Sequence, residues 1–163
     1  DIRLSLVGSE MCIRDRYRLL DNGIALLNVF GVLAHRGGIS ANSAYIQGYD
    51  TLARTLQSAL QDPNVKGIVL NIDSPGGEVA GAFQLAGEIY AARGQKPIAA
   101  VASDMACSAA YLIASAADTI SLTATGTVGS IGVVTCHADL SRALDKKGVA
   151  ITCLLYTSPS PRD

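Results

Sequence analysis

A short run, Gly67–Ile72, which is apolar apart from Asn71, leads directly into the turn Asp73–Gly77, and this junction constrains the fold most strongly. Continuous apolar runs of this length are typical of parallel strands that are covered on both faces. Two adjacent glycines after such a strand can present bare backbone N–H groups to an oxyanion. The sequence therefore predicts an α/β protein with Gly76 and Gly77 at the carboxyl end of a strand, the edge where ligands bind.

A second segment, Met105–Tyr111, follows the next predicted strand and opens a helix of small residues. It places Ser108 at a helix N-terminus, where a nucleophile can be exposed. Taken alone, a glycine pair after proline is usually a simple turn, and a serine at a helix start is usually a cap. Because the two segments follow successive strands of one βαβ unit, together they indicate half of an acyl-transfer site.

The two ends of the chain are related to each other as DNA. Back-translated Leu6–Asp15, read on the opposite strand in a shifted frame, gives codons for Cys153–Arg162. Inverted repeats of this kind resemble the adapter that a transposase-tagged sequencing library leaves at both ends of a fragment. We therefore expect residues 1–16 and 153–163 to be adapter-derived and exclude them from fold reasoning. Residues 17–152 are expected to be one domain, a fragment of a longer protein.

Composition excludes several classes of function. The formal net charge is −1 and only 5% of residues are aromatic, so nucleic-acid binding is not expected. Outside the expected adapter segments the cysteines are Cys107 and Cys136, which indicate neither a disulfide framework nor a metal site. The apolar stretch Ile24–Ala34 is shorter than the ~18 to 20 residues of a membrane span. No membrane segment and no cofactor are expected, and a reducing, cytoplasmic location is favoured.

Hydrophobic periodicity predicts alternating strands and helices. The expected strands are Ile24–Leu33, Gly67–Ile72, Pro97–Ala102, Thr119–Leu122, Ile131–Thr135 and one that starts at Val149. The expected helices run from a cap at Asn42 or Ser43 to just before Asp62, and then over Glu78–Arg93, Ser108–Ala116 and Ala138–Lys146. This alternation predicts a mostly parallel sheet.

Four stretches carry a family resemblance that covers nearly all of residues 17–152. They are Val65–Leu70 with Asp73–Gly77, Met105–Tyr111, Ala114–Asp118 and Thr127–Val133. The chain resembles the signal-peptide-peptidase-A-like serine peptidases, which implies an α/β, Clp-peptidase/crotonase-like fold with repeated β-β-α units.

Details of two of these stretches resemble one branch of that family. Ala109 and Ala110 stand where signal-peptide peptidases more often carry glycines, and the second feature is the stretch Gly77–Gly81. Both features resemble the phage head-maturation branch, whose members cut capsid or scaffold proteins.

The resemblance implies roles for four residues. Ser108 would be the nucleophile, the N–H groups of Gly77 and Ala109 would form the oxyanion hole, and Ser130 would orient a lysine base. In this family that lysine is kept neutral by desolvation and lies in a Gly-x-x-Lys stretch soon after the strand that begins here at Val149. The chain reaches the expected adapter before such a stretch, so the fragment as given is expected to be inactive.

No other residue is an obvious substitute for the missing base. Lys66 and Lys96 precede their strands and should lie at the opposite edge of the sheet. Lys146–Lys147 end a helix, where cations usually remain solvated. His137 with Asp139 could indicate a histidine-based triad as in the Clp peptidases, but a histidine after a strand is more often structural.

Other polar residues have ordinary explanations. His35 falls in an expected loop, and Cys107 is interpreted as a small buried residue. Asp73 is interpreted as a structural residue that bonds turn amides. For Ser130, a turn serine and a lysine-orienting serine are equally good interpretations.

The main hypothesis is a serine endopeptidase with a Ser/Lys dyad that acts on extended peptide segments, in phage capsid maturation or in signal-peptide-type degradation. The resemblance also implies a homo-oligomer. Two alternatives stay open. One is a crotonase-like enzyme that binds acyl-CoA, against which Ser108 argues, and the other is a non-catalytic capsid-assembly module.

Overall fold

The computed structural model describes residues 17–39 and 45–150. The chain divides into two compact units, residues 1–133 and 134–163, which are treated separately. The strands of the first unit are β1 (Arg18–Leu19), β2 (Ile24–Ala34), β3 (Gly38–Ile39), β4 (Tyr45–Gly48), β5 (Gly67–Gly77), β6 (Ile98–Cys107), β7 (Thr119–Leu122) and β8 (Thr127–Gly129). Its helices are α2 (Tyr49–Gln61), α3 (Ala82–Ala91) and α4 (Ala109–Ser115).

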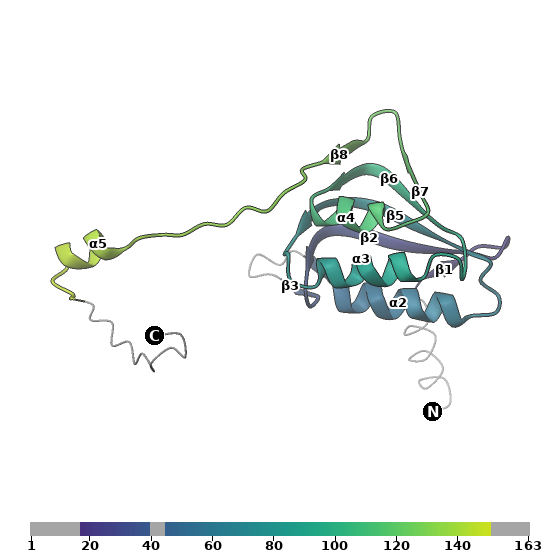
Figure 1. Cartoon of the computed structure of the whole chain (residues 1–163), viewed down its shortest axis with the longest axis horizontal. Coiled ribbons are helices and arrows are strands. Elements are labelled where there is room, and N and C mark those ends of the chain that lie inside the picture. Colours follow the sequence, from purple (N-terminus) through teal and green to yellow (C-terminus); the bar gives the residue numbers. More distant parts are fainter. Residues whose placement is uncertain (1–16, 40–44, 151–163) are drawn as a thin grey trace, which may run out of the picture. The chain divides into compact units, whose positions relative to one another are not determined.

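The strands form one sheet in the order β3-β4-β2-β5-β6-β7, with β1 also beside β2 and β8 also beside β6. Two short pairs, β1 with β2 and β3 with β4, are antiparallel, and the other pairs are parallel. Since β5 lies between β2 and β6, the ends of these three strands meet at one edge (Figure 1). The predicted α/β class and mostly parallel sheet are confirmed.

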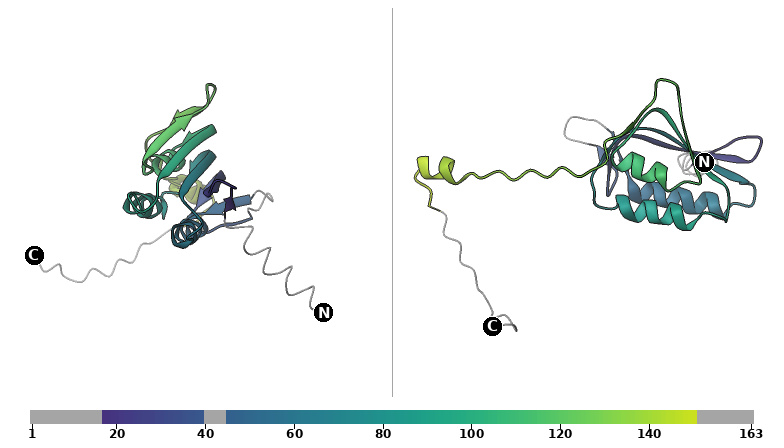
Figure 2. Two further views of the ribbon diagram at one scale, coloured as in Figure 1. Left: turned by 90° about the vertical axis from the view of Figure 1, so that its right-hand side faces the viewer. Right: turned by 45° about the horizontal axis from the view of Figure 1, so that its top comes forward.

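Helices α2, α3 and α4 pack on the same face of the sheet (Figures 1 and 2). Side chains alternate along a strand, so every second one points toward these helices. Full burial of a large apolar side chain contributes about 1.5 to 3 kcal/mol to the stability of the fold. These buried strand residues are Ala25, Leu27, Val29, Leu33, Ile68, Leu70, Ile72, Ile98, Ala100, Ala102 and Ala106. On the other face Phe30 and Val32 of β2 are exposed, while Val69 and Asn71 of β5 are half-buried. Strand Gly67–Ile72, expected to be covered on both faces, is therefore fully buried on its helix-facing side and half-buried on the other.

The start of α2 differs from the prediction. The proposed caps Asn42 and Ser43 lie outside the described residues, while Tyr45–Gly48 forms strand β4, so the helix begins only at Tyr49. Strand β4 pairs with the end of β2 through Ile46–Gly48, and Tyr45 itself pairs with Ile39 of β3, which holds it in extended backbone. Positions i and i+4 share a face in a strand as well as in a helix, so the spacing of Tyr45 and Tyr49 could not separate the two.

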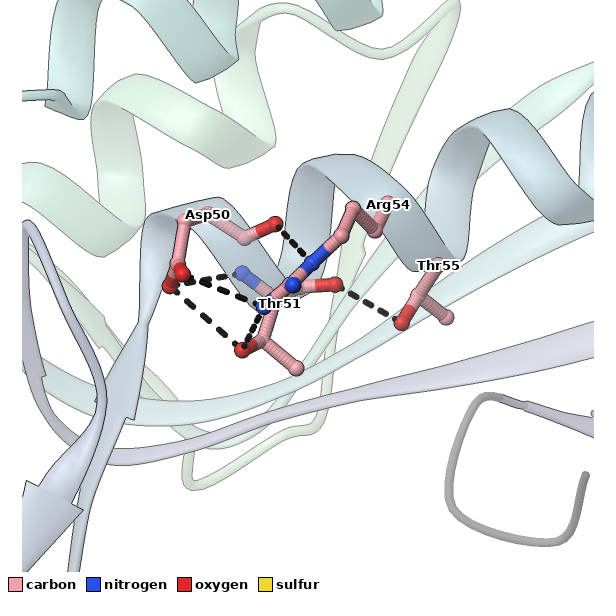
Figure 3. Close-up of polar contacts among 4 residues, drawn as sticks. All are labelled: Asp50, Thr51, Arg54 and Thr55. Atoms are coloured by element: carbon pink, nitrogen blue, oxygen red, sulfur yellow. Dashed lines mark hydrogen bonds and ion pairs between the residues drawn. The ribbon is translucent and has the colours of Figure 1, made fainter. Parts of the chain in front are cut away.

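Polar side chains stabilise the first turns of α2 (Figure 3). Asp50 Oδ1 accepts a hydrogen bond from the Thr51 N–H at 2.8 Å, and Arg54 Nη2 lies 3.1 Å from Asp50 Oδ2. Thr55 Oγ1 donates to the Thr51 carbonyl at 2.8 Å. The N-cap residue, Gly48, has no side chain that could cap the helix. The carboxylate of Asp50 in the first turn stabilises the helix start instead, because it complements the helix dipole.

Strands β5 and β6 run further than expected, through the segments predicted as turns. Ser74 pairs with Ala106 and Gly77 pairs with Leu33, so the glycine motif remains part of the ladder to its last residue, while the second motif stays in β6 as far as Cys107. The register shifts between Ile72 and Ser74, which marks an irregularity just before the glycines.

The predicted strand Ile131–Thr135 is wrong, because none of these residues belongs to a strand. Gly129, Ser130 and Gly132 have φ values of 134°, 54° and 149°, which carry the chain out of the extended region. The strand in this part of the chain is β8, which ends at Gly129.

The second unit contains the helix α5 (Ser141–Lys146), which is shorter than the predicted Ala138–Lys146 and has no buried residue. Val149 and Ala150 are not in a strand, and the rest of the strand predicted from Val149 lies outside the described residues. The expected adapter segments, 1–16 and 153–163, also lie outside them.

Candidate active site

Ser108 occupies a strained turn between β6 and α4. Its backbone has φ 53° and ψ −123°, a conformation that costs a non-glycine residue about 1 to 3 kcal/mol. Its N–H donates to the Gly129 carbonyl at 2.8 Å, and its carbonyl accepts from the Leu112 N–H at 3.0 Å. Its side chain makes no capping hydrogen bond to the helix. The ordinary explanation of this serine as a helix cap therefore does not hold.

The glycine turn touches the Ser108 turn through its backbone. Gly76 has φ 96°, and a Cβ atom there would lie 2.7 Å from both the Cys107 carbonyl oxygen and Ser108 Cβ. A Cβ atom on Gly77 would overlap the backbone of Leu33 on β2. Both positions thus require glycine, because a side chain would separate strands that must lie in contact.

Ser74 holds the glycine turn, a role that the sequence interpretation gave to Asp73. Ser74 is fully buried, and its Oγ donates to the Gly31 carbonyl at 2.6 Å and accepts from the Gly76 N–H at 3.0 Å. Asp73 lies on the exposed face of β5. The expectation that Asp73 bonds the turn amides is therefore wrong. The alternation of side chains along a strand could have distinguished Ser74 from Asp73, since Ser74 shares the face of the buried Ile72.

A cavity of about 340 Å³ brings most of the predicted site residues together. Its lining is mainly apolar and comes from the ends of β5, α3, α4 and the segment after β8. The lining residues are Gly77, Val79, Ala82, Phe83, Ser108, Ala109, Tyr111, Leu112, Ser115, Ile131, Gly132 and Val133. Three of the four predicted site residues, Ser108, Gly77 and Ala109, are therefore in one cavity.

The fourth, Ser130, is exposed and does not line this cavity. Its two chain neighbours nevertheless reach the site, because the Gly129 carbonyl binds the Ser108 N–H and Ile131 lines the cavity. Ser130 has φ 54°, so its backbone is strained as well. The structure thus places Ser130 one residue away from the hydrogen-bond partner of Ser108.

The lysines of the first unit lie far from this edge, as expected. Lys96 Nζ donates to the carbonyls of Ala59 and Asp62 at 2.9 and 2.6 Å, at the C-terminal end of α2. Lys66 precedes β5 and lies beside Gly23, at the amino end of the sheet. Neither ammonium group is placed to take a proton from Ser108.

In the second unit the possible pair of His137 and Asp139 gains no support. Asp139 accepts hydrogen bonds from the backbone and the hydroxyl of Ser141, and these bonds lower the pKa of its carboxyl. Cys107, in the first unit, is half-buried, rather than fully buried as expected. Among residues 17–39 and 45–150, no cluster of three His, Cys, Asp or Glu side chains could hold a metal ion.

Sequence reasoning missed two residues behind the glycine turn. Tyr49 is 2% exposed, and its hydroxyl donates to the Glu78 carbonyl at 2.7 Å. Burial, with a smaller contribution from the charge of Glu78, raises the pKa of Tyr49 to about 12, so this hydroxyl stays a donor at neutral pH. His35 lies in a loop, as predicted, and its N–H donates to Glu78 Oε2 at 3.1 Å.

Comparison with known proteins identifies relatives of the chain. Residues 91–158 match the model of peptidase family S49. The chain is 47% identical over 141 residues to the head-tail preconnector protein GP5 of Enterobacteria phage P21, which covers 86% of this chain and 28% of that protein. It is 46% identical over 136 residues to the capsid assembly protease C of Escherichia phage lambda, covering 83% and 31%. The predicted resemblance to the phage branch of these peptidases is confirmed.

A more distant relative is also a protease. Protease 4 of Haemophilus influenzae is 33% identical over 134 residues, which is 78% of this chain and 20% of that protein. The chain spans less than a third of the length of these curated relatives. The family match runs past the expected boundary at Thr152, so it does not support that boundary.

Solved structures confirm the fold class. A mutant of the 1510-N membrane-bound stomatin-specific protease, in complex with a substrate peptide, superposes with a TM-score of 0.53 at 20% identity, covering 73% of this chain and 50% of that one. An enoyl-CoA hydratase/isomerase family member gives a TM-score of 0.53 at 14% identity, covering 82% and 51%. Within the described part of the chain, no helix is both long and apolar enough to span a membrane.

Proposed function

This chain is related to the peptidases of family S49, and on that premise we propose that its parent protein is a serine endopeptidase with Ser108 as nucleophile. The observation that carries the proposal is the conformation of Ser108. Its positive φ, the absence of a capping bond and its place in the cavity suit a hydroxyl that is held for reaction. Strained strand-to-helix turns serve the same purpose in other serine hydrolases.

We propose that the N–H groups of Gly77 and Ala109 form the oxyanion hole. The Glu78 N–H donates to the Leu33 carbonyl at 2.9 Å, and successive N–H groups of a strand point to opposite sides. That of Gly77 is therefore directed away from β2, toward the side where β6 leads to Ser108. Ala109 is the first residue of α4, where N–H groups have no acceptor within the helix. One such donor is worth about 3 to 4 kcal/mol in the transition state.

In the proposed reaction, Ser108 Oγ attacks the scissile carbonyl and gives its proton to a base. The developing oxyanion accepts hydrogen bonds from the two backbone groups. The C–N bond then breaks, the base returns the proton to the departing amine, and an ester on Ser108 remains. Water hydrolyses this ester and restores the serine.

We propose that the base is a lysine encoded beyond Thr152 in the uninterrupted gene and oriented by Ser130. The proposal is supported by the family relationship and by the positions of Lys66 and Lys96 at the opposite edge of the first unit. We further propose that both ends of the present sequence are adapter-derived, so that it lacks the base and is inactive.

The substrate we propose is an extended segment of a capsid or scaffold protein, cut by a homo-oligomer in the cytoplasm of a bacterial host. The phage relative named capsid assembly protease C supports this choice over signal-peptide-type degradation. The cavity beside Ser108 suits an apolar side chain of such a segment, because Phe83, Leu112 and Val133 line it.

The experiment is hydrolysis of capsid and scaffold peptides by the chain continued with its native sequence past Thr152. We expect turnover, and Ser108→Ala should lower kcat/KM by at least about 10⁴-fold, as removal of a serine nucleophile does elsewhere. Ser121→Ala, which changes an exposed serine of β7, is the control and should leave kcat/KM unchanged. Turnover that survives Ser108→Ala would exclude the nucleophile. Absence of turnover in the continued wild type would favour the non-catalytic capsid-assembly module.

A further inference from the structure

The loop Glu78–Gly81 joins the glycine turn to α3, and it borders the cavity through Val79 and through the residues on either side of it. Gly77 precedes it, Val79 lies within it and Ala82 follows it, and all three line the cavity of Ser108. The loop has few constraints of its own, since Gly81 has φ 89° and offers no capping side chain to α3. Whatever holds this loop therefore also sets the geometry of the cavity rim.

Tyr49 contacts this loop at both ends. Its hydroxyl donates to the Glu78 carbonyl at 2.7 Å, at the start of the loop. Its ring packs at the end of the loop, because a Cβ atom on Gly81 would lie 3.1 Å from Tyr49 Cδ2. Tyr49 is itself fixed, as the first residue of α2 and 2% exposed in the core. A rigid, buried aromatic ring thus spans the loop.

Glu78 is held at two further atoms. Its N–H donates to the Leu33 carbonyl at 2.9 Å, and its Oε2 accepts from the His35 N–H at 3.1 Å. With the Tyr49 hydroxyl on its carbonyl, the residue directly after Gly77 is bonded at its nitrogen, its oxygen and its side chain. Together with the pairing of Gly77 and Leu33 in the sheet, these bonds to its neighbour restrict how the Gly77 peptide group is oriented.

We propose that Tyr49 is a positioning residue, which acts through Glu78 to hold the Gly77 N–H and the cavity rim in their working geometry. The proposal rests on the proposed function, since it assigns Tyr49 to the same site. Without the hydroxyl, the Glu78 carbonyl loses its buried donor and the loop can pivot about two glycines. A displaced oxyanion donor slows the chemical step more than it weakens binding of the ground state.

The kinetic test uses Tyr49→Phe in the chain continued past Thr152. We expect kcat to fall about tenfold while KM changes by less than about twofold, since only the transition state needs the Gly77 donor. Tyr17→Phe is the matched control. It removes a hydroxyl that bonds Asp62 at 2.7 Å at the other end of α2, and should leave kcat unchanged. An equal loss of kcat in both variants would mean a merely structural role and would overturn the proposal.

A second measurement separates this inference from the proposed function. In the 163-residue chain itself, amide NMR of Tyr49→Phe should show displaced Gly77 and Glu78 signals and about tenfold faster exchange of the Glu78 N–H. Tyr17→Phe should leave both signals in place. If the continued chain hydrolyses no peptide, the proposed function fails. The amide measurement still shows whether Tyr49 positions Gly77 and Glu78. Unchanged Gly77 and Glu78 signals in Tyr49→Phe would overturn it.

Discussion

At the scale of single residues, backbone strain is concentrated at the candidate site. Within the described part of the chain, Ser108 and Ser130 are the two non-glycine residues with a left-handed φ. A single hydrogen bond, from the Ser108 N–H to the Gly129 carbonyl, links the two strained turns. Strain of this kind persists only where the surroundings enforce it, and it gathers at functional sites. Two strained serines on neighbouring turns therefore support one common site.

Gly76→Ala tests the contact between the glycine turn and Ser108. The new methyl group would meet the Cys107 carbonyl oxygen and Ser108 Cβ at 2.7 Å, in a backbone conformation with φ 96°. We expect a loss of about 2 to 4 kcal/mol in the free energy of unfolding, measured with urea. Gly87→Ala, in α3 with open space around it, is the control and should stabilise the chain by about 0.5 to 1 kcal/mol. Equal effects at the two positions would contradict the close packing at Gly76.

The sequence was informative for residues that belong to a local motif. It was uninformative for residues whose side chains bond backbone groups far away in the sequence. Ser108, Gly77 and Ala109 stand in motifs that their own neighbours reveal, and the structure brings them to one cavity. Ser74 and Tyr49 contact Gly31 and Glu78, which are remote along the chain. Such partners become visible only when the strand register and the start of α2 are known.

At the scale of the elements, α4 is held at its C-terminal end by one side chain. The Arg93 guanidinium donates to the carbonyls of Ser115, Ala116 and Ala117, with the Ala116 bond at 2.8 Å. It also lies 4.4 Å from the centre of the Tyr90 ring, and its Nε is 3.9 Å from Asp118 Oδ1. The last carbonyls of a helix have no partner within it, so Arg93 supplies what α4 lacks. This gives a physical reason for the Ala114–Asp118 motif.

Arg93→Ala should therefore lower the free energy of unfolding by about 1 to 3 kcal/mol, because three carbonyls, two of them in part-buried hydrogen bonds, lose a charged donor. Arg93→Lys should recover only part of the lost free energy of unfolding, since one ammonium group cannot reproduce the several hydrogen bonds of the planar guanidinium group. The measurement is urea unfolding. Arg54→Ala, which breaks an exposed pair with Asp50, is the control and should cost less than about 0.5 kcal/mol. A loss for Arg93→Ala no larger than for Arg54→Ala would contradict this role of Arg93.

The C-terminal end of α2 should make stability depend on pH. The Tyr17 hydroxyl, followed by the Asn64 N–H, lowers the pKa of the Asp62 carboxyl below its ordinary value. A carboxyl whose pKa is lowered by folding stabilises the fold at pH values above its pKa in the unfolded chain, which is about 4. This stabilisation is lost as the pH falls through the pKa of the carboxyl in the folded chain. The stability difference between wild type and Tyr17→Phe should therefore shrink on acidification below about pH 4. A difference that stays constant with pH in urea unfolding would contradict it.

Periodicity predicted most elements and failed where two structures share a period or where glycines intervene. Tyr45 has helical spacing to Tyr49 but belongs to β4, because pairing with Ile39 of β3 decides its conformation. Ile131 and Val133 form an apolar run but no strand, because Ser130 and Gly132 have positive φ. Pairing partners and backbone angles are tertiary facts, so a local pattern could not supply them.

At the scale of the whole molecule, the alternation of strands and helices was sufficient to predict a mostly parallel α/β sheet, and the family resemblance predicted its relatives. The order of β5, β6 and β7 follows from the rule that successive parallel strands pair side by side, whereas β5 pairs with β2 and not with the preceding β4. The partial exposure of the second sheet face could not be predicted, because an apolar run looks the same whether one face or both are buried. The expected adapter-derived ends remain a proposal, because they lie outside the described residues.

The central claim is that Ser108 is the nucleophile of a site that needs a base from beyond Thr152. The most direct measurement is covalent labelling with a serine-reactive phosphonate, with the modified residue located by mass spectrometry. The chain continued with its native sequence should be labelled at Ser108, while the 163-residue chain should not be labelled. Label on another serine of the continued chain, or efficient labelling of Ser108 in the 163-residue chain, would contradict the account.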